Sequence, residues 1–364
     1  MKAFRSFIDR YALIIAMVIG VLGWRWFRHL GWLTSPLIFM MLFFTFCKIN
    51  PLDLRLRRWH WIVLGVQLAL VVGIMAMGYG ILAIGDGVLA IGDGLWGIGD
   101  GVLAIGDGLW AMGNGVVLQG LVLCLIMPTA TAAPIIAGKL GGSIQNLTTF
   151  TLLSNLLTAL VVPALFPVIN PSADIAFFSA AWQILCRVTP LLILPFLCAW
   201  AIRLVYEGYH RRKGTPRRFA LNTTWASMPF YLWILLLVVL MARITDTLLN
   251  VVYEGWMIGV MCVGALVACL LQFALGRWIG YRFPADSHGA DFQDILINPA
   301  AAHYTLSEKS RVTAGQAFGQ KNTALGIWMA QMFLHPLAAI APAAYILWQN
   351  LLNSYQLWKA GRKS

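Results

Sequence analysis

Residues 255–280 read GWMIGVMCVGALVACLLQFALGRWIG, and no charged side chain interrupts this run before Arg277. A single α-helix needs about 20 apolar residues to cross the hydrocarbon core of a bilayer. Residues 222–244 form a second run of this kind, which is uncharged until Arg243. Two such runs are typical of membrane-spanning helices.

The composition of the whole chain agrees with these two runs. Of 364 residues, 60% are apolar and 11% are charged, whereas a soluble domain carries about 25% charged residues. The 26 basic and 14 acidic side chains are too few to cover a soluble surface, which excludes soluble, disordered, collagen-like and disulfide-scaffold proteins. We expect an all-α polytopic membrane protein with free cysteines packed in apolar surroundings.

The apolar segments predict ten spanning helices. Their expected ranges are about 11–29, 34–48, 59–79, 117–138, 147–169, 178–205, 222–244, 255–280, 311–332 and 335–357. With both termini on one side of the membrane, the loops on that side contain 21 of the 26 Lys and Arg residues, and the other side contains Arg25, Arg28 and Arg243. The positive-inside rule then places both termini in the cytoplasm, and we expect a bacterial inner-membrane protein. The basic clusters indicate topology and contacts with anionic lipids, so we expect no nucleic-acid partner.

Residues 80–114 repeat with a period of seven, as GILAIGD, GVLAIGD, GLWGIGD, GVLAIGD and GLWAMGN. Two glycines in every seven residues cost roughly 1 kcal/mol each relative to alanine, which disfavours an ordinary water-exposed helix. We expect an expanded repeat in an outward-facing surface loop, although four aspartates could also bind a cation weakly. The sequence leaves the conformation of this segment open.

The acidic residues are all placed in loops or at the ends of predicted helices. No carboxylate therefore lies at a helix centre, where it could serve a proton relay or paired-carboxylate catalysis. We expect no enzyme activity, no catalytic residue, no metal site and no cofactor.

The fourth predicted helix is interrupted by Pro128-Thr-Ala-Thr-Ala-Ala-Pro134. Two prolines remove backbone donors and free carbonyl groups within the helix. Such a break is tolerated at membrane depth only where the backbone is buried or lines a wet cavity. The segment, with Thr129 and Thr131 between the prolines, is a candidate site, and a plain proline kink between packed helices is the alternative.

The ninth predicted helix contains four consecutive polar residues, Gln320, Lys321, Asn322 and Thr323. A lysine at the bilayer centre costs about 2.5–3.5 kcal/mol on insertion scales. It needs a partner, water or the loss of its proton. The alternative is a shifted span from whose end Lys321 reaches the interface.

These two segments resemble the bile acid:sodium symporter family of ten-helix secondary transporters. Pro128-Thr-Ala-Thr-Ala is similar to the family's Pro-Gly-Gly-Thr-Ala-Ser-Asn break, and Phe318-Gly-Gln-Lys-Asn-Thr-Ala-Leu to its Val-Gly-Met-Gln-Asn-Ser-Gly-Leu break. Gln67 falls where the family has a third-helix glutamine, and Trp348-Gln-Asn resembles its tenth-helix Trp-His-Asn. The resemblance covers nearly the whole chain except about 80–114 and 285–308, which look like insertions.

The resemblance implies two inverted five-helix repeats whose broken fourth and ninth helices cross near the membrane midplane. It also implies a panel domain of about 1–58 and 178–244 and a core domain of about 59–169 and 255–357. Substrate and coupling residues would lie at the crossing. The candidates are Gln67, Pro128, Thr129, Thr131, Pro134, Thr151, Gln320, Lys321, Asn322 and Thr323.

The sequence departs from the family at its sodium ligands. The family's Ser-Asn pair is replaced by Ala133 and Pro134, its ninth-helix glutamate by Ala317 and the glutamine after it by Lys321. A fifth-helix serine becomes Leu147, while Thr151, Gln67 and Asn322 are kept. An ammonium group 4 Å from a sodium ion would repel it by roughly 4 kcal/mol.

The resemblance and these departures together predict a secondary transporter that moves small organic anions by alternating access without the family's sodium sites. Its expected partners are a small organic anion and membrane lipids, with sodium or protons as alternatives for the coupling ion. The alternatives in function are a sodium-coupled symporter of an organic anion such as a bile acid, and a non-transporting sensor.

Overall fold

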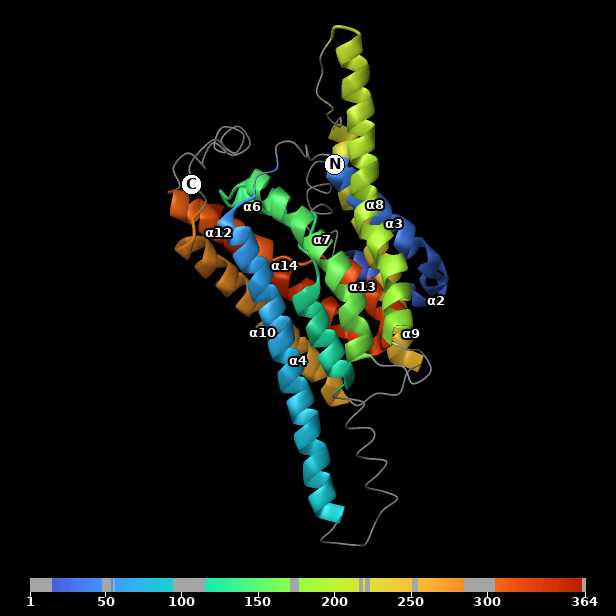
Figure 1. Ribbon diagram of the computed structural model, residues 1–364. Helices are drawn as coiled ribbons and strands as arrows, with labels where there is room; N and C mark the ends of the chain where they lie inside the picture. The colour runs from blue at the N-terminus through green and yellow to red at the C-terminus, as the bar shows by residue number, and fades with distance from the viewer. Residues whose placement is uncertain are drawn as a thin grey trace.

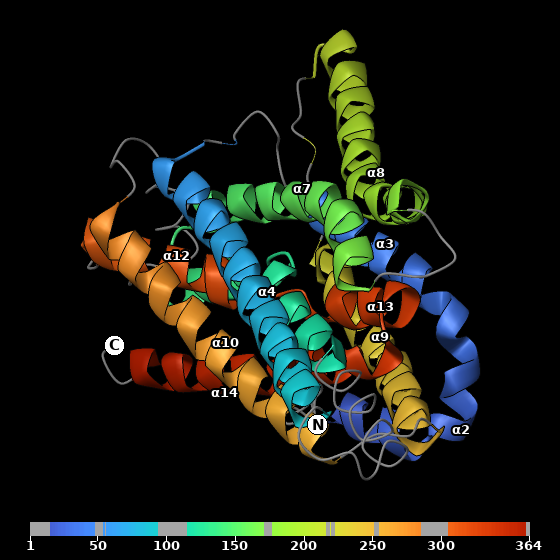
Figure 2. The same cartoon turned by 60° about the horizontal axis from the view of Figure 1, so that its bottom comes forward.

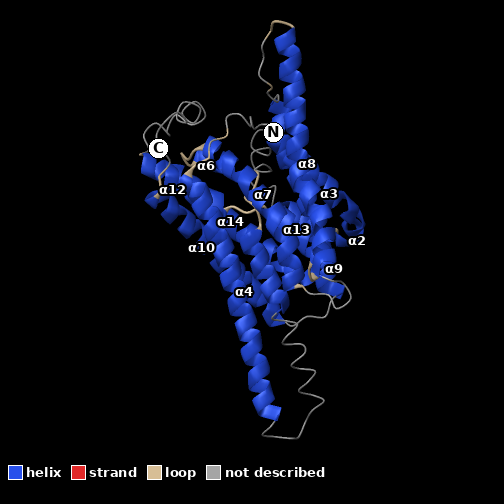
Figure 3. Cartoon of the chain, viewed as in Figure 1, coloured by secondary structure: helices blue, strands red, loops and turns tan. Residues whose placement is uncertain are grey.

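The computed structural model describes residues 15–47, 54, 56–93, 115–170, 177–215, 219, 223–250, 255–284 and 305–361. Throughout these residues the regular structure is helical and no strand is formed (Figure 3). The all-α prediction is therefore confirmed for the described part of the chain.

The helices follow one another along the chain with short connections between most of them (Figure 1). After a helical segment at residues 15–22, they are α2 (Trp24–Phe27), η1 (Arg28–Leu33), α3 (Thr34–Cys47), α4 (Arg58–Asp93), the apolar helix Gly115–Ile126, α6 (Ala133–Lys139), α7 (Ile144–Ile169), α8 (Phe177–Arg212), α9 (Thr223–Asn250), α10 (Gly255–Arg282), α12 (Leu306–Gly319), α13 (Thr323–Phe333), η4 (Pro336–Ala339) and α14 (Ile340–Gly361).

Six helical segments within the described ranges are long and apolar enough to cross a membrane. They are Trp24–Cys47, Arg58–Gly78, Ile144–Ile169, Phe177–Arg212, Tyr231–Asn250 and Gly255–Arg282. The chain is thus an integral membrane protein, and its described part is all-α. The sequence predicted two spans with a loop near residues 30–33, but the 3-10 helix η1 connects α2 directly to α3 there.

The helix α4 is longer than the sequence predicted. A loop was expected from residue 80, yet α4 continues through Asp93, and its far end projects from the bundle in Figure 1. The reason is cooperativity, because adding a turn to an existing helix is much cheaper than nucleating a new one, and this offsets the cost of the glycines. The rest of the repeat, residues 94–114, lies outside the described residues.

The helix α12 also begins earlier than predicted, at Leu306 rather than near residue 311. Its start is fixed by a capping box, in which the Thr305 hydroxyl accepts from the Glu308 N–H at 3.2 Å and the Glu308 carboxylate accepts from the Thr305 N–H at 2.9 Å. This reciprocal pair satisfies N–H groups that the first turn leaves free. Residues 305–308 of the predicted insertion therefore form a helix start, and its residues 285–304 lie outside the described residues.

Close contact between α10 and α12 holds the second broken helix in place. Gly276 and Gly280 are four residues apart on α10, and a Cβ atom at either position would collide with the backbone carbonyl groups of Ala314 and Ser310 on α12. Small residues at this spacing allow helices to approach closely in membranes. Elsewhere α3 packs on both α8 and α9, α10 packs on α14, and α4 lies alongside α10 (Figure 2).

Candidate functional site

The first helix break lies between Gly115–Ile126 and α6. Residues 127–132 are not helical, since Pro128 lacks an N–H and restricts the residue before it to extended conformations. Pro134 lies in the first turn of α6, where its missing N–H would have no intrahelical partner in any case. The predicted interruption is confirmed, and it is a full break rather than a kink.

The second break lies between α12 and α13. Gln320 leaves the helix with an extended backbone, and helical structure resumes at Thr323. Asn322 caps α13, because its side-chain oxygen accepts from the Leu325 N–H at 3.3 Å. The predicted interruption of the ninth helix is therefore confirmed as well.

The two breaks cross each other as antiparallel extended backbone. Thr129 and Lys321 face each other in a β-bridge. The Ala130 N–H donates to the Gln320 carbonyl at 2.8 Å, and the Asn322 N–H donates to the Pro128 carbonyl at 2.7 Å. Each break thus satisfies backbone groups that the other one frees, as a buried backbone requires.

Lys321 is at the centre of the crossing, and its side chain is only 1% exposed. Its ammonium group donates to the Leu125 carbonyl at 3.2 Å and lies 5.1 Å from the ring centroid of Phe318. That carbonyl belongs to the last turn of a helix, where the helix dipole favours a positive charge. The alternative in which Lys321 reaches out to the interface is therefore wrong.

The neighbouring carbonyl groups at the end of Gly115–Ile126 are bound by amide and hydroxyl side chains from three other helices. The Gln272 amide donates to the Cys124 carbonyl at 3.1 Å, the Gln67 amide donates to the Ile126 carbonyl at 3.2 Å, and the Thr158 hydroxyl donates to the same Ile126 carbonyl at 3.2 Å. These donors and Lys321 compensate for the interrupted helix, because an unpaired carbonyl in an apolar interior is costly.

The end of α12 is bound in the same manner from the other side. The Thr129 hydroxyl donates to the Ala317 carbonyl and the Tyr345 hydroxyl donates to the Gly319 carbonyl, both at 2.7 Å. Two side chains accept from the bridge itself: the Ser154 hydroxyl from the Thr129 N–H at 3.1 Å, and the Gln349 amide oxygen from the Lys321 N–H at 3.0 Å.

Most residues predicted for the site do lie at the crossing. They are Gln67, Pro128, Thr129, Gln320, Lys321, Asn322 and Thr323. For the other three predicted residues, no hydrogen bond to the crossing is formed within the described part. Thr131 is half-buried in the turn before α6, and Pro134 lies in the first turn of α6. The Thr151 hydroxyl donates to the Leu147 carbonyl of its own helix at 2.9 Å.

Sequence reasoning missed Ser154, Thr158, Gln272 and Tyr345, and it noted Gln349 only within the tenth-helix motif. The one local signal for Gln272 is that it is the single amide within the long apolar run 255–280. Buried amides in apolar helices usually have a hydrogen-bond partner. The sequence around Gln272 does not indicate which group that partner is.

No metal centre is apparent in the described residues, since they contain no group of three or more His, Cys, Asp or Glu side chains that could hold a metal ion. Three amide oxygens near the crossing, those of Gln67, Gln272 and Gln320, are buried with no partner among the described residues. The amino group of Lys321 lies between the broken helices, where it donates to the Leu125 carbonyl. The arrangement therefore offers a buried ionisable amine together with polar amides.

The comparison with known proteins adds no family assignment. The chain matches no protein-family model and no curated protein. The functional interpretation therefore rests on the residues of the crossing and on the resemblance of its motifs.

Proposed function

We propose that the protein is a secondary transporter, which moves small organic anions across the membrane by alternating access. The observation that carries this proposal is the crossing of two broken helices around the buried ammonium group of Lys321. Discontinuous helices that meet at membrane depth are a common way to build transporter sites, because their ends expose backbone charge to substrates and ions.

The proposal includes ten spanning helices arranged as two inverted repeats. The two breaks support this repeat, because both have the same kind of partner. A side chain from a helix later in the chain accepts a hydrogen bond from each break. Ser154 of α7 accepts from the first break, and Gln349 of α14 accepts from the second. The packing of α3 on α8 and α9, and of α10 on α12 and α14, fits the proposed panel and core domains.

We place both termini in the cytoplasm of a bacterial cell, with the protein in the inner membrane, from the distribution of basic residues. This orientation is testable without a substrate. A cysteine introduced at Asp100 in a cysteine-free variant should react with a membrane-impermeant maleimide added to cells with a permeable outer envelope. Labelling that requires cell lysis would reverse the orientation.

In this mechanism Lys321 supplies the charge that a bound cation supplies in related transporters. Its ammonium group interacts with the carbonyl end of Gly115–Ile126, and it is tethered, so it is not released in each transport cycle. The resulting site needs no sodium ion for its stability. A positive potential at the crossing also favours an anionic substrate over a neutral or cationic one.

Counterflow in liposomes tests this function. A panel of carboxylates and sulfonates, including bile acids, is first screened for anions that raise the melting temperature of the purified protein. Liposomes loaded with the best anion should then accumulate its labelled form transiently. Lys321→Gln should lose this exchange, whereas Lys139→Gln, a change of an exposed lysine, should keep it. Binding without any exchange would favour a non-transporting sensor.

A further inference from the structure

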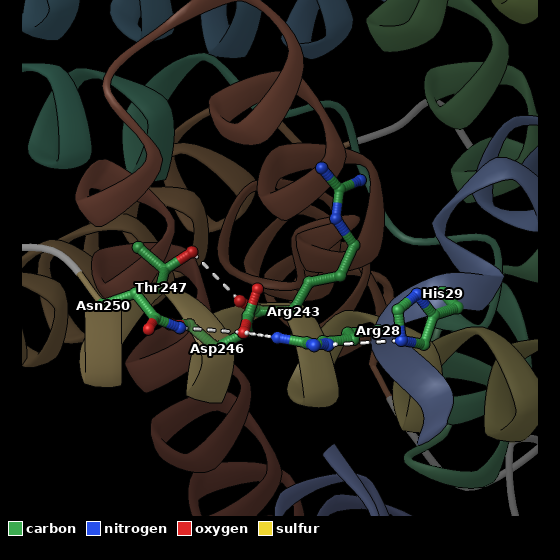
Figure 4. A network of polar contacts seen from close by, with 6 residues as sticks. All are labelled: Arg28, His29, Arg243, Asp246, Thr247 and Asn250. Carbon is green, nitrogen blue, oxygen red and sulfur yellow. Dashed lines mark hydrogen bonds and ion pairs between the residues drawn. The ribbon is translucent and has the colours of Figure 1, made fainter. Parts of the chain in front are cut away.

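A second group of charges lies away from the crossing, at the ends of η1 and α9 that face outward in the proposed orientation. Figure 4 shows this group, which contains Arg28, His29, Arg243, Asp246, Thr247 and Asn250. Basic residues are rare on this side of the chain and are disfavoured there by the positive-inside rule.

The single carboxylate in this group is already occupied. Asp246 accepts from the Arg28 guanidinium at 2.9 Å and from the Asn250 amide at 2.9 Å. Arg28 also lies over the ring of Trp24, with its guanidinium carbon 5.3 Å from the ring centroid. Arg28 and Asp246 therefore neutralise each other at the protein surface.

Arg243 has no such partner. It is half-buried on α9, and among the described residues its guanidinium group forms neither a hydrogen bond nor an ion pair. Figure 4 shows the guanidinium turned away from Asp246, although that residue is only three positions further along the helix. A guanidinium group carries five N–H donors and a permanent charge, so leaving it unpaired within a span is costly.

The side chain of Arg243 lies where α9 meets η1. The stem of its side chain passes close to Gly31 of η1, where a Cβ atom would lie 3.2 Å from the Arg243 Cδ atom. The same helix α9 also packs against α13 and η4, which follow the second break. Arg243 thus belongs to a helix that contacts both proposed domains, which the proposed mechanism moves relative to each other.

From this geometry we infer that Arg243 is the outer recognition residue for the carboxylate or sulfonate group of the transported anion. The planar fork of its donors matches such a group in a bidentate manner. This inference rests on the proposed function for the direction of substrate entry, but the binding of an anion to Arg243 can be measured without transport.

The experiment uses an arginine-specific reagent, p-hydroxyphenylglyoxal, with cholate and benzenesulfonate as probes. The purified full-length protein is modified in detergent and in liposomes, with and without each probe, and mass spectrometry measures the modified fraction of Arg243. Arg25 is the internal control, since it is an exposed arginine on the same side. We expect the probes to slow the modification of Arg243 several-fold and that of Arg25 little.

Two variants extend this test. Arg243→Gln should raise the probe concentration needed for half-maximal thermal stabilisation about tenfold to a hundredfold, which corresponds to the loss of a charge-assisted hydrogen bond. Arg25→Gln makes the same change in net charge, and it should change this half-maximal probe concentration little. If Arg243→Gln does not fold, Arg243→Lys keeps the charge but loses the fork, and an intermediate shift is expected.

Three results separate the outcomes. Protection of Arg243 without counterflow would retain the anion site and reject the transport function. Counterflow without protection of Arg243 by either probe would overturn the inference. A third result would also overturn the inference. If Arg243 reacts with the reagent in detergent but is already protected in liposomes without a probe, its partner is a lipid headgroup.

Discussion

The two breaks meet at one point but contribute different chemical groups to it. The first break, at residues 127–132, contributes the carbonyl end of a helix and the hydroxyl group of Thr129. The second break contributes an ionisable donor, the amino group of Lys321, which donates to that carbonyl end. The first break therefore supplies hydrogen-bond acceptors, and the second supplies a donor that can carry a positive charge.

This difference shows how a similar interruption in two helices can yield an electrostatically asymmetric site. In both breaks the backbone groups of the bridge pair with each other and with one side chain of a later helix. The side chains at the bridge then decide the charge, and only the second break places an ionisable group there. A tethered charge can stabilise a helix end permanently, whereas a diffusible ion does so only while it is bound.

The largest effect is expected from reversing that charge. Lys321→Glu places a carboxylate against the Leu125 carbonyl and the negative end of the helix dipole. The cost is about 3–5 kcal/mol, the scale of leaving a buried charge uncompensated. Size-exclusion chromatography of the solubilised protein should show the loss of the monodisperse peak.

The matched control for this substitution is Lys139→Glu, which reverses the charge of an exposed lysine in the last turn of α6. It should keep a normal peak. Monodisperse peaks of equal height for Lys321→Glu and Lys139→Glu would mean that Lys321 does not stabilise the first break.

A smaller effect is expected at the end of α12. Tyr345→Phe removes the hydroxyl group that donates to the Gly319 carbonyl and accepts from the Gln272 amide. Leaving these buried groups without a partner should cost about 1–3 kcal/mol. The melting temperature in detergent should fall, while Tyr355→Phe, at an exposed position of the same helix, should leave it unchanged. An equal fall in both would remove the specific role of Tyr345.

The smallest loss of stability is expected at the first break. Thr129→Val keeps the side-chain shape but removes the hydrogen bond to the Ala317 carbonyl, at a cost of about 1 kcal/mol. Thr131→Val is the control, because Thr131 is half-buried nearby and its hydroxyl binds nothing in the described residues. If both substitutions lower the melting temperature equally, the hydrogen bond across the crossing contributes nothing measurable.

The sequence predicted both breaks and their main residues because their signals are local. Pro128 must interrupt a helix, and four polar residues at 320–323 cannot lie unpaired in a span. The partners have no such local signal. Lys321 binds Leu125 across 196 positions of sequence, and neither residue indicates the other.

The differences between prediction and structure also have physical causes. Thr151 was expected at the crossing, and in the structure its hydroxyl donates to the Leu147 carbonyl one turn earlier in its own helix, as threonines in helices often do. The extension of α4 to Asp93 was missed, because propensities weigh each glycine separately and ignore the helix that is already formed.

The central claim is that Lys321 takes the place of a bound sodium ion. The most direct test is the melting temperature of the purified protein as NaCl is raised at constant ionic strength, with KCl making up the difference. A ligand that binds the folded state raises this temperature in a saturable way. We predict the same melting temperature at every NaCl fraction, because the ammonium group already occupies the carbonyl end of the first break. A saturable rise that is specific for sodium would contradict the account.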